Sequence, residues 1–254
     1  METVTFQLNE PAGSTTATDE SGRFIGKVND SSSFTGDGYL HGNGISNYID
    51  FENYDTSFKV STGLSLETRI KPVGLEGTAT YIRRIFARDS SNQNYQLSIW
   101  RNNSLFPDYN APSGTASIAF WVSPVDKHGG VAWKPVLTDY STHPIVSDHF
   151  YRIKVIWNSS KIGSIPVNIF IDDEGTDGNG LGENWQGYVD ATDSDQSLVP
   201  ADRRLYEGDK ITMADGDFVI GSNVNNHNNN ILNGLIDWIK WQGVVDYSGV
   251  DNPP

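Results

Sequence analysis

An aspartate interrupts an apolar strand near the C-terminus of this 254-residue chain. The segment NGLIDWIKW, residues 233–241, alternates with the period of two that is typical of a β-strand. That alternation places Asp237 on the same face as Leu235, Ile239 and Trp241. A carboxylate on a buried face costs free energy unless another group pairs with it. The sequence therefore predicts a specific binding partner for Asp237.

Basic and aromatic side chains fall on the polar faces of several expected strands. Flat aromatic rings stack on sugars, and arginine binds carboxylate or sulfate through two parallel hydrogen bonds. We therefore expect a glycan-binding face, with an acidic glycan slightly favoured. The alternative is a solvated sheet face on which Arg and Lys protect edge strands from pairing. The candidate residues are Arg69, Arg84, Arg88, Trp100, Trp121 and Arg152, with Arg84 and Arg88 aligned on one strand face.

Two further tryptophans lie in glycine-flanked loops, Trp133 in HGGVAWKP and Trp185 in GENWQGY. A tryptophan in such a loop either pins the loop to the core or faces a ligand. Trp185 is the next candidate for ligand binding after the strand tryptophans.

Catalytic and transition-metal motifs are weak. The chain has no cysteine, and its five histidines lack the H-x-x-x-H or H-E-x-x-H spacing of a zinc site. No G-x-S-x-G nucleophile elbow occurs. The acidic segment IDDEGTDGNG, residues 171–180, lacks the EF-hand pattern and is better interpreted as a solvated turn.

The charge of the chain excludes some partners. A formal net charge of -14 disfavours nucleic acid, which needs a basic face. No apolar run approaches the roughly 18 residues of a membrane span, and the N-terminus lacks the pattern of a signal peptide. We expect no membrane insertion and interpret the chain as a domain excised from a secreted parent protein.

Period-2 segments recur from end to end, and no window of useful length has a 3.6-residue period. This pattern predicts an all-β antiparallel sandwich forming a single domain over residues 1–254, with long loops near 102–144 and 172–210. The expected strands are TVTFQL, NYIDFEN, GLSLETRIKP, YIRRIFAR, NYQLSIW, ASIAFWVSP, HFYRIKVIWN, VNIFIDD, DFVIGS and GLIDWIKW.

The order of these segments resembles the laminin-G-like, concanavalin-A-like jelly-roll domains. The resemblance rests on TDESG (18–22), NYIDF (47–51), LSLETRIKP (64–72), FYRIKVIWN (150–158), VNIFIDD (167–173), FVIGS (218–222) and NGLIDWIKW (233–241). It spans nearly the whole chain in the order of the family. It implies a concanavalin A-like jelly roll, whereas function varies widely within this fold.

The resemblance also implies a structural calcium ion. Related jelly rolls often hold one with an aspartate of the last strand and oxygens from the N-terminal strand and the glycine-rich loop. Asp237 matches that aspartate, and Glu10 and Asp37 are its expected partners. The alternative is that Asp237 accepts backbone N–H groups or caps a turn.

The function implied is that of a non-catalytic carbohydrate-binding module, monomeric and part of a larger secreted or cell-surface bacterial protein. A polysaccharide lyase or glycoside hydrolase is the first alternative, although the E-x-D-x-x-E, R-x-E-L-R and Q-I-H strand motifs of such enzymes are missing. The second alternative is a cell-surface adhesion domain.

Overall fold

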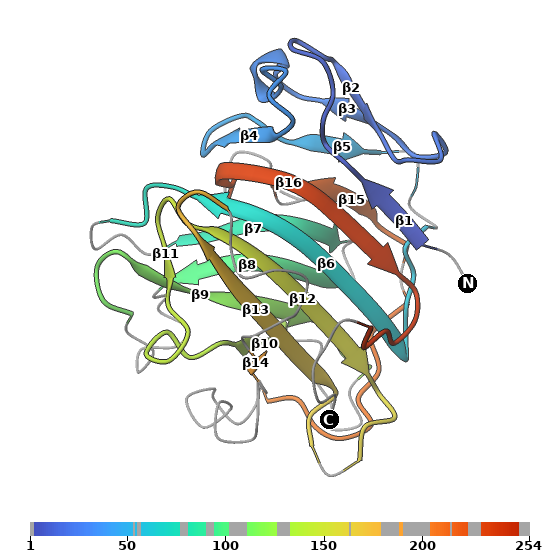
Figure 1. The fold of residues 1–254 in the computed structure, drawn as a ribbon. Helices are drawn as coiled ribbons and strands as arrows, with labels where there is room; N and C mark the ends of the chain where they lie inside the picture. Colours follow the sequence, from blue (N-terminus) through green and yellow to red (C-terminus); the bar gives the residue numbers. More distant parts are fainter. Residues whose placement is uncertain are drawn as a thin grey trace.

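The computed structural model describes residues 3–52, 54, 57–76, 81–89, 94–101, 111–125, 133–162, 164–178, 188–189, 204–213, 215–222 and 230–248. In these ranges the regular structure consists of β-strands and one short 3-10 helix, η1 (Ser31–Ser33). The strands form two sheets that pack face to face (Figure 1). The predicted all-β antiparallel sandwich is confirmed.

Seven of the described strands form one sheet, in the order β1-β16-β6-β12-β13-β14, with β4 also paired to β16. β1 and β16 are antiparallel neighbours, so the first and last strands of the described chain close one side of this sheet. The members are β1 (Thr3–Phe6), β4 (Leu40–Asn43), β6 (Gly63–Pro72), β12 (Phe150–Asn158), β13 (Val167–Gly175), β14 (Tyr188–Val189) and β16 (Asn233–Gln242).

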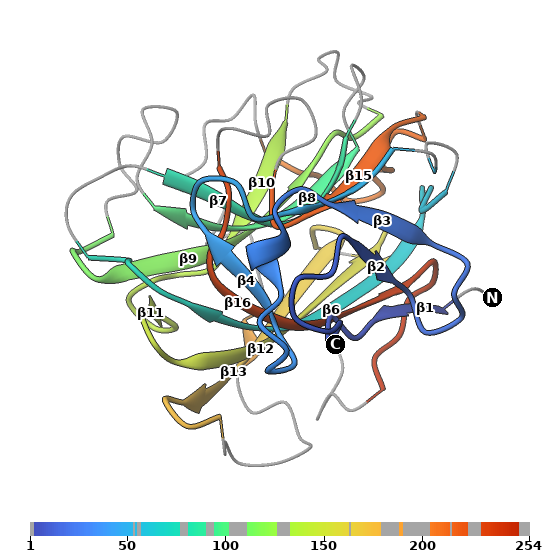
Figure 2. The same cartoon turned by 90° about the horizontal axis from the view of Figure 1, so that it is seen from above.

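Nine of the described strands form the second sheet, in the order β10-β9-β8-β7-β15-β5-β3-β2, with β11 paired to β9. Figure 2 shows β7, β8 and β9 on the opposite side of the sandwich from β6, β12 and β16. The members are β2 (Thr16–Thr18), β3 (Ile25–Val28), β5 (Ile49–Phe51), β7 (Tyr81–Asp89), β8 (Tyr95–Arg101), β9 (Thr115–Val122), β10 (Lys134–Leu137), β11 (Ile145–Val146) and β15 (Asp217–Ile220).

The inner faces of the two sheets form one apolar core, as the alternation of the sequence predicts. In β6 the buried core positions include Leu64, Leu66 and Ile70, and the intervening side chains point outward. Aromatic rings of the two sheets meet in this core: the rings of Phe6 in β1 and Phe51 in β5 lie edge to face at 5.1 Å. Since both inner faces are mainly apolar, each sheet presents most of its polar strand residues on its outer face.

Within 102–144 the structure has the expected strand ASIAFWVSP as β9 and a further strand, β10, between the loop segments. In the second predicted loop, residues 172–210, β13 extends to Gly175 and β14 pairs with β13. Most of the other residues of this range lie outside the described residues. No helix in the described ranges is long and apolar enough to span a membrane.

Candidate functional site

Asp237 does not lie on the inner face, and that part of the prediction is wrong. The register of β16 against β6 shifts between Ile236 and Trp238, so Asp237 is the extra residue of a β-bulge. The bulge turns its side chain to the outer face of the seven-stranded sheet, while Ile236, Ile239 and Trp241 remain in the core. One extra residue reverses the alternation, which sequence patterning does not reveal.

The partner of Asp237 is Arg69. Its Nη1 donates to Asp237 Oδ2 at 2.7 Å, its Nε donates to Glu174 Oε2 at 2.8 Å, and its Nη2 donates to the carbonyl oxygen of Gly178 at 3.2 Å. The guanidinium also lies 4.2 Å above the ring of Phe150. Desolvation alone would lower the pKa of Arg69, but the bonds to Asp237 and Glu174 outweigh it and raise the pKa. Arg69 of β6 therefore links β12, β13, β16 and the loop at Gly178.

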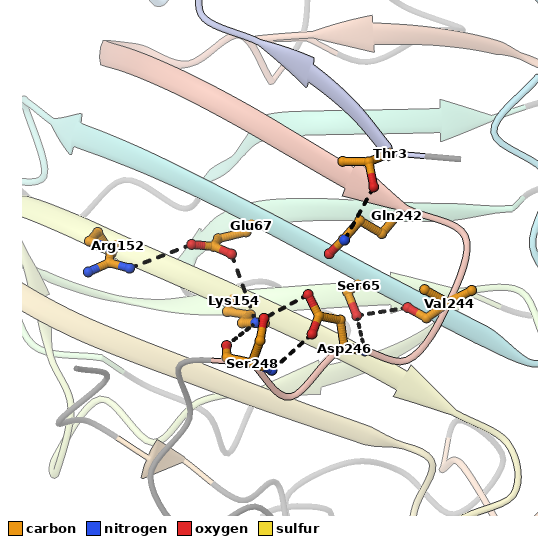
Figure 3. Close-up of polar contacts among 9 residues, drawn as sticks. All are labelled: Thr3, Ser65, Glu67, Arg152, Lys154, Gln242, Val244, Asp246 and Ser248. Carbon is orange, nitrogen blue, oxygen red and sulfur yellow. Dashed lines mark hydrogen bonds and ion pairs between the residues drawn. The ribbon is translucent and has the colours of Figure 1, made fainter. Parts of the chain in front are cut away.

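The rest of this outer face is also occupied by contacts within the chain (Figure 3). Arg152 Nη2 lies 3.6 Å from Glu67 Oε1, and the buried Lys154 donates to the carbonyl oxygen of Ser248 at 2.7 Å. Burial lowers the pKa of Lys154 against the opposing effects of Glu67 and Asp246. Residues 244–248 thus fold back over the sheet and hold its charged side chains.

The nine-stranded sheet has an outer face of a different kind. One cross-strand row contains Pro135, Trp121, Gln96 and Ala87, and the next contains Leu137, Ala119, Ser98 and Arg84. Trp121 Nε1 donates to Ser98 Oγ at 3.1 Å, which fixes the indole on this face. The face combines tryptophans with neutral polar groups and an arginine, Arg84.

The predicted exposure of the two strand tryptophans is wrong. Trp100 is 0% exposed and Trp121 is 3% exposed, because other side chains cover this outer face. They form an apolar cluster with Ala119 and Leu137, against which the partly buried Trp133 and Tyr140 pack. Trp133 and Tyr140 are therefore the aromatic residues of this cluster that retain access to solvent, and Tyr140 was missed from the sequence.

The predicted alignment of Arg84 and Arg88 is also wrong. A bulge between Arg84 and Phe86 separates them. Arg84 stays on the outer face opposite Ser98, whereas Arg88 points inward opposite Tyr95 and donates to the carbonyl oxygen of Ser57 at 2.8 Å. Of the predicted arginines, Arg84 alone joins Trp100 and Trp121 on one face, since Arg69 and Arg152 lie on the other sheet.

Two polar residues at the end of the β8–β9 pair were also missed. Asn94 and Ser123 flank these strands directly, and Ser123 N donates to the carbonyl oxygen of Asn94 at 2.9 Å. Their neighbours Tyr95 and Val122 point into the core, so Asn94 and Ser123 share the outer face with Gln96 and Trp121. The alternation of NYQLSIW could have indicated this position.

The predicted calcium ligands do not fit a metal ion at Asp237, because its carboxylate already binds the guanidinium of Arg69. Both oxygens of Asp37 lie 2.9 Å from His41 Nε2. Glu10 Oε1 accepts from Thr18 N at 2.9 Å. Across the described ranges no group of three or more His, Cys, Asp or Glu side chains is placed to hold a metal. Trp185 lies outside the described residues.

No protein-family model and no curated protein sequence matches this chain. Among solved structures, the receptor-binding domain of botulinum neurotoxin mosaic serotype C/D is similar, with a TM-score of 0.51 and 12% identity over 97% of this chain and 48% of that one. The binding domain of botulinum neurotoxin serotype G has a TM-score of 0.50 and 12% identity over 96% of this chain and 48% of that one.

A third structure, domain 4 of the extracellular arabinanase AbnA from Geobacillus stearothermophilus in complex with arabinotriose, has a TM-score of 0.42 and 15% identity over 97% of this chain and 84% of that one. The chain spans about half the length of the two toxin domains. At this identity the toxin domains establish the β-sandwich fold and nothing finer. The laminin-G-like resemblance stays a prediction.

Proposed function

We propose that this chain is a non-catalytic carbohydrate-binding module that binds its glycan on the outer face of the nine-stranded sheet. The observation that carries the proposal is the aromatic cluster on that face. Trp133 and Tyr140, partly exposed, pack on the buried Trp100 and Trp121, and neutral polar side chains surround them. Stacking aromatics beside groups that bond hydroxyls are what a sugar site needs. We place the parent protein outside the cell, as a secreted or surface protein of a bacterium.

An acidic glycan, with uronate or sulfate groups, is the finer form of the proposal. Its support is Arg84, a guanidinium on the same face as the tryptophans. Arginine binds a carboxylate or sulfate with two hydrogen bonds of fixed geometry. The net charge of -14 opposes such a ligand only at long range, because salt screens charges beyond about 8 Å.

The proposed function includes a structural calcium ion bound near Glu10. Among the described residues Glu10 Oε2 is a buried atom with no hydrogen-bond partner. Burial raises the pKa of Glu10, against the lowering effect of the hydrogen bond from Thr18. A hydrogen bond from Gly13 N to the carbonyl oxygen of Phe34 joins the loop after Glu10 to the segment that leads to Asp37. A calcium ion near Glu10 would compensate its charge and stabilise this junction.

A polysaccharide lyase is the second candidate, favoured by one cluster. His149 Nδ1 lies 3.0 and 3.1 Å from the two oxygens of Asp173, and its ring stacks on that of Tyr151. An aspartate that orients a histidine leaves the other ring nitrogen to accept a proton. The test is whether the wild type forms unsaturated products from a uronate polysaccharide and His149→Ala does not. That result would support a lyase instead of a binding module.

The test is a glycan array followed by titration calorimetry on the glycan that binds. Trp133→Ala is expected to weaken binding about thirtyfold, since truncation of an aromatic anchor costs about 2 kcal/mol. Trp238→Ala is the matched control, because Trp238 is likewise partly buried but lies in β16 of the other sheet. Equal affinity of both variants and the wild type would place any binding elsewhere, and a wild type that binds no glycan would refute the proposal.

A further inference from the structure

Two buried polar atoms on the outer face of the nine-stranded sheet lack the contacts that burial demands. Among the described residues, Asn94 Nδ2 and Ser123 Oγ have no hydrogen-bond partner. Asn94 is 1% exposed and Ser123 is 0% exposed. Leaving such an atom unsatisfied costs roughly 1–3 kcal/mol, and native proteins contain few of them.

These two atoms belong to one place. The hydrogen bond from Ser123 N to the carbonyl oxygen of Asn94 extends the β8–β9 ladder by one residue pair beyond Tyr95 and Val122. Side chains of directly opposed residues on one face lie about 5 Å apart at Cβ. Asn94 and Ser123 are therefore neighbours, and the pair formed by Gln96 and Trp121 is next to them on the same face.

Part of this face forms its hydrogen bonds within the chain. Ser98 Oγ accepts from Trp121 Nε1 and donates to the carbonyl oxygen of Ala119. Asn94 Nδ2 and Ser123 Oγ differ from the Ser98–Trp121 pair, because among the described residues they lack such bonds where β8 begins and β9 ends.

The surface comes close to the pair at this end of the sandwich. Thr212 N donates to the carbonyl oxygen of Ser123, and Val125 N donates to that of Lys210. Val125 and Met213, on either side of these bonds, are among the exposed large apolar residues. Exposed apolar side chains therefore lie within two residues of Ser123 and of its backbone partner Thr212.

We infer that Asn94 and Ser123 form a subsite that binds a neutral hydroxyl group of a sugar residue. The amide Nδ2 donates, and the Ser123 hydroxyl both donates and accepts, so together they complement a hydroxyl. Neither side chain carries a charge, so this subsite differs from Arg84, which is proposed to bind the carboxylate or sulfate group of the glycan. The inference rests on the proposed carbohydrate binding and adds the residues that recognise the hydroxyl. Because both atoms are buried, covering side chains must move, and association is expected to be slow.

The experiment measures affinity and melting temperature for Ser123→Ala, Asn94→Leu and Ser33→Ala, with the glycan that the wild type selects on an array. Ser33→Ala is the matched control, because Ser33 Oγ is also buried without a hydrogen-bond partner among the described residues but lies in η1. We expect Ser123→Ala and Asn94→Leu each to weaken binding about tenfold, the effect of one lost hydrogen bond to a buried partner. Ser33→Ala should bind like the wild type, and no serine variant should melt at a lower temperature.

The outcomes separate the two proposals. If Ser123→Ala binds the glycan as the wild type does while Trp133→Ala does not, carbohydrate binding stands and the subsite is refuted. If the wild type binds no glycan on the array, both fail. Ser123→Ala removes a single oxygen and keeps the fold testable even if Asn94→Leu does not fold.

Discussion

The two sheets differ in how their outer faces use polar side chains. On the seven-stranded sheet the basic residues Arg69, Arg152 and Lys154 each lie within 4.0 Å of a carboxylate of the same chain. On the nine-stranded sheet the outer face carries tryptophans, neutral polar side chains and Arg84, and the buried Asn94 Nδ2 and Ser123 Oγ lack hydrogen-bond partners within the described part of the chain.

This difference between the two outer faces indicates which of them is available to a ligand. An arginine whose three nitrogens already bond carboxylates and a carbonyl must give up those bonds before it can bind anything else. A buried amide or hydroxyl without a partner gains a bond when a ligand arrives. We therefore assign stability to the seven-stranded face and recognition to the nine-stranded face, and substitutions on each face test that assignment.

The largest expected effect is the loss of stability in Arg69→Met. Removing the guanidinium leaves Asp237 and Glu174 next to each other without a cation, and breaking a largely buried ion pair costs about 3 kcal/mol. In a domain of this size that lowers the melting temperature by roughly 6–12 °C in calorimetry. Glycan affinity at a temperature where the variant is folded should not change.

Lys71→Met is the control for this prediction. Lys71 lies on the same face of β6, but in the described part of the chain its Nζ bonds the carbonyl oxygen of Thr176 at 3.3 Å and lies over the Phe150 ring without a carboxylate partner. We expect the stability of this variant to fall by less than about 1 kcal/mol. Equal stability of both variants and the wild type would mean that the Arg69 contacts add nothing to the stability of the fold. The assignment of stability to the seven-stranded face would then be wrong.

A smaller effect is expected for arginine-to-lysine exchange. Arg84→Lys keeps the charge but loses the two-pronged hydrogen bond, so affinity for a uronate or sulfated glycan should fall about tenfold. Arg152→Lys, the same exchange on the other sheet, should leave affinity unchanged. Titrations at low and high salt complete the measurement, since an acidic ligand binds more weakly as salt rises. Salt-insensitive binding of a neutral glucan by all three proteins would refute the acidic preference.

The sequence predicted the fold because its signals are local. Alternation in segments such as GLSLETRIKP fixes which side chains enter the core, and glycine-rich and asparagine-rich stretches fix the turns. The same signals failed where one extra residue enters a strand. The bulges at Asp237 and after Arg84 each reverse the face on which the next residues of the strand lie, so Asp237 was placed inside and Arg88 outside.

The candidate site was predicted only in part, for a second physical reason. Alternation correctly put Trp100 and Trp121 on a polar strand face, but whether an outer face is exposed depends on residues far away in the sequence. The partner of Asp237 was likewise remote: Arg69 is 168 residues away. Asn94 and Ser123 were missed although the expected strands NYQLSIW and ASIAFWVSP include them, because the sequence does not show that their buried polar atoms lack hydrogen-bond partners among the described residues.

The smallest expected effect concerns calcium, and it sharpens the comparison because Arg69 already supplies the cation that Asp237 needs. Calcium at ten times its Kd should stabilise the wild type by about 1.4 kcal/mol, and a chelator should remove that gain. Glu10→Gln should abolish the calcium response, whereas Asp237→Asn should keep it.

The raised pKa of Glu10 means that the folded state holds this proton more tightly than the unfolded state. Without calcium, stability is therefore lost as pH rises from the ordinary pKa of 4.5 through the raised pKa of the folded state, and Glu10→Gln should remove that loss. If the calcium response instead disappears in Asp237→Asn and persists in Glu10→Gln, calcium binds at Asp237 in the last strand. Arg69 would then not be the cation that compensates the charge of Asp237.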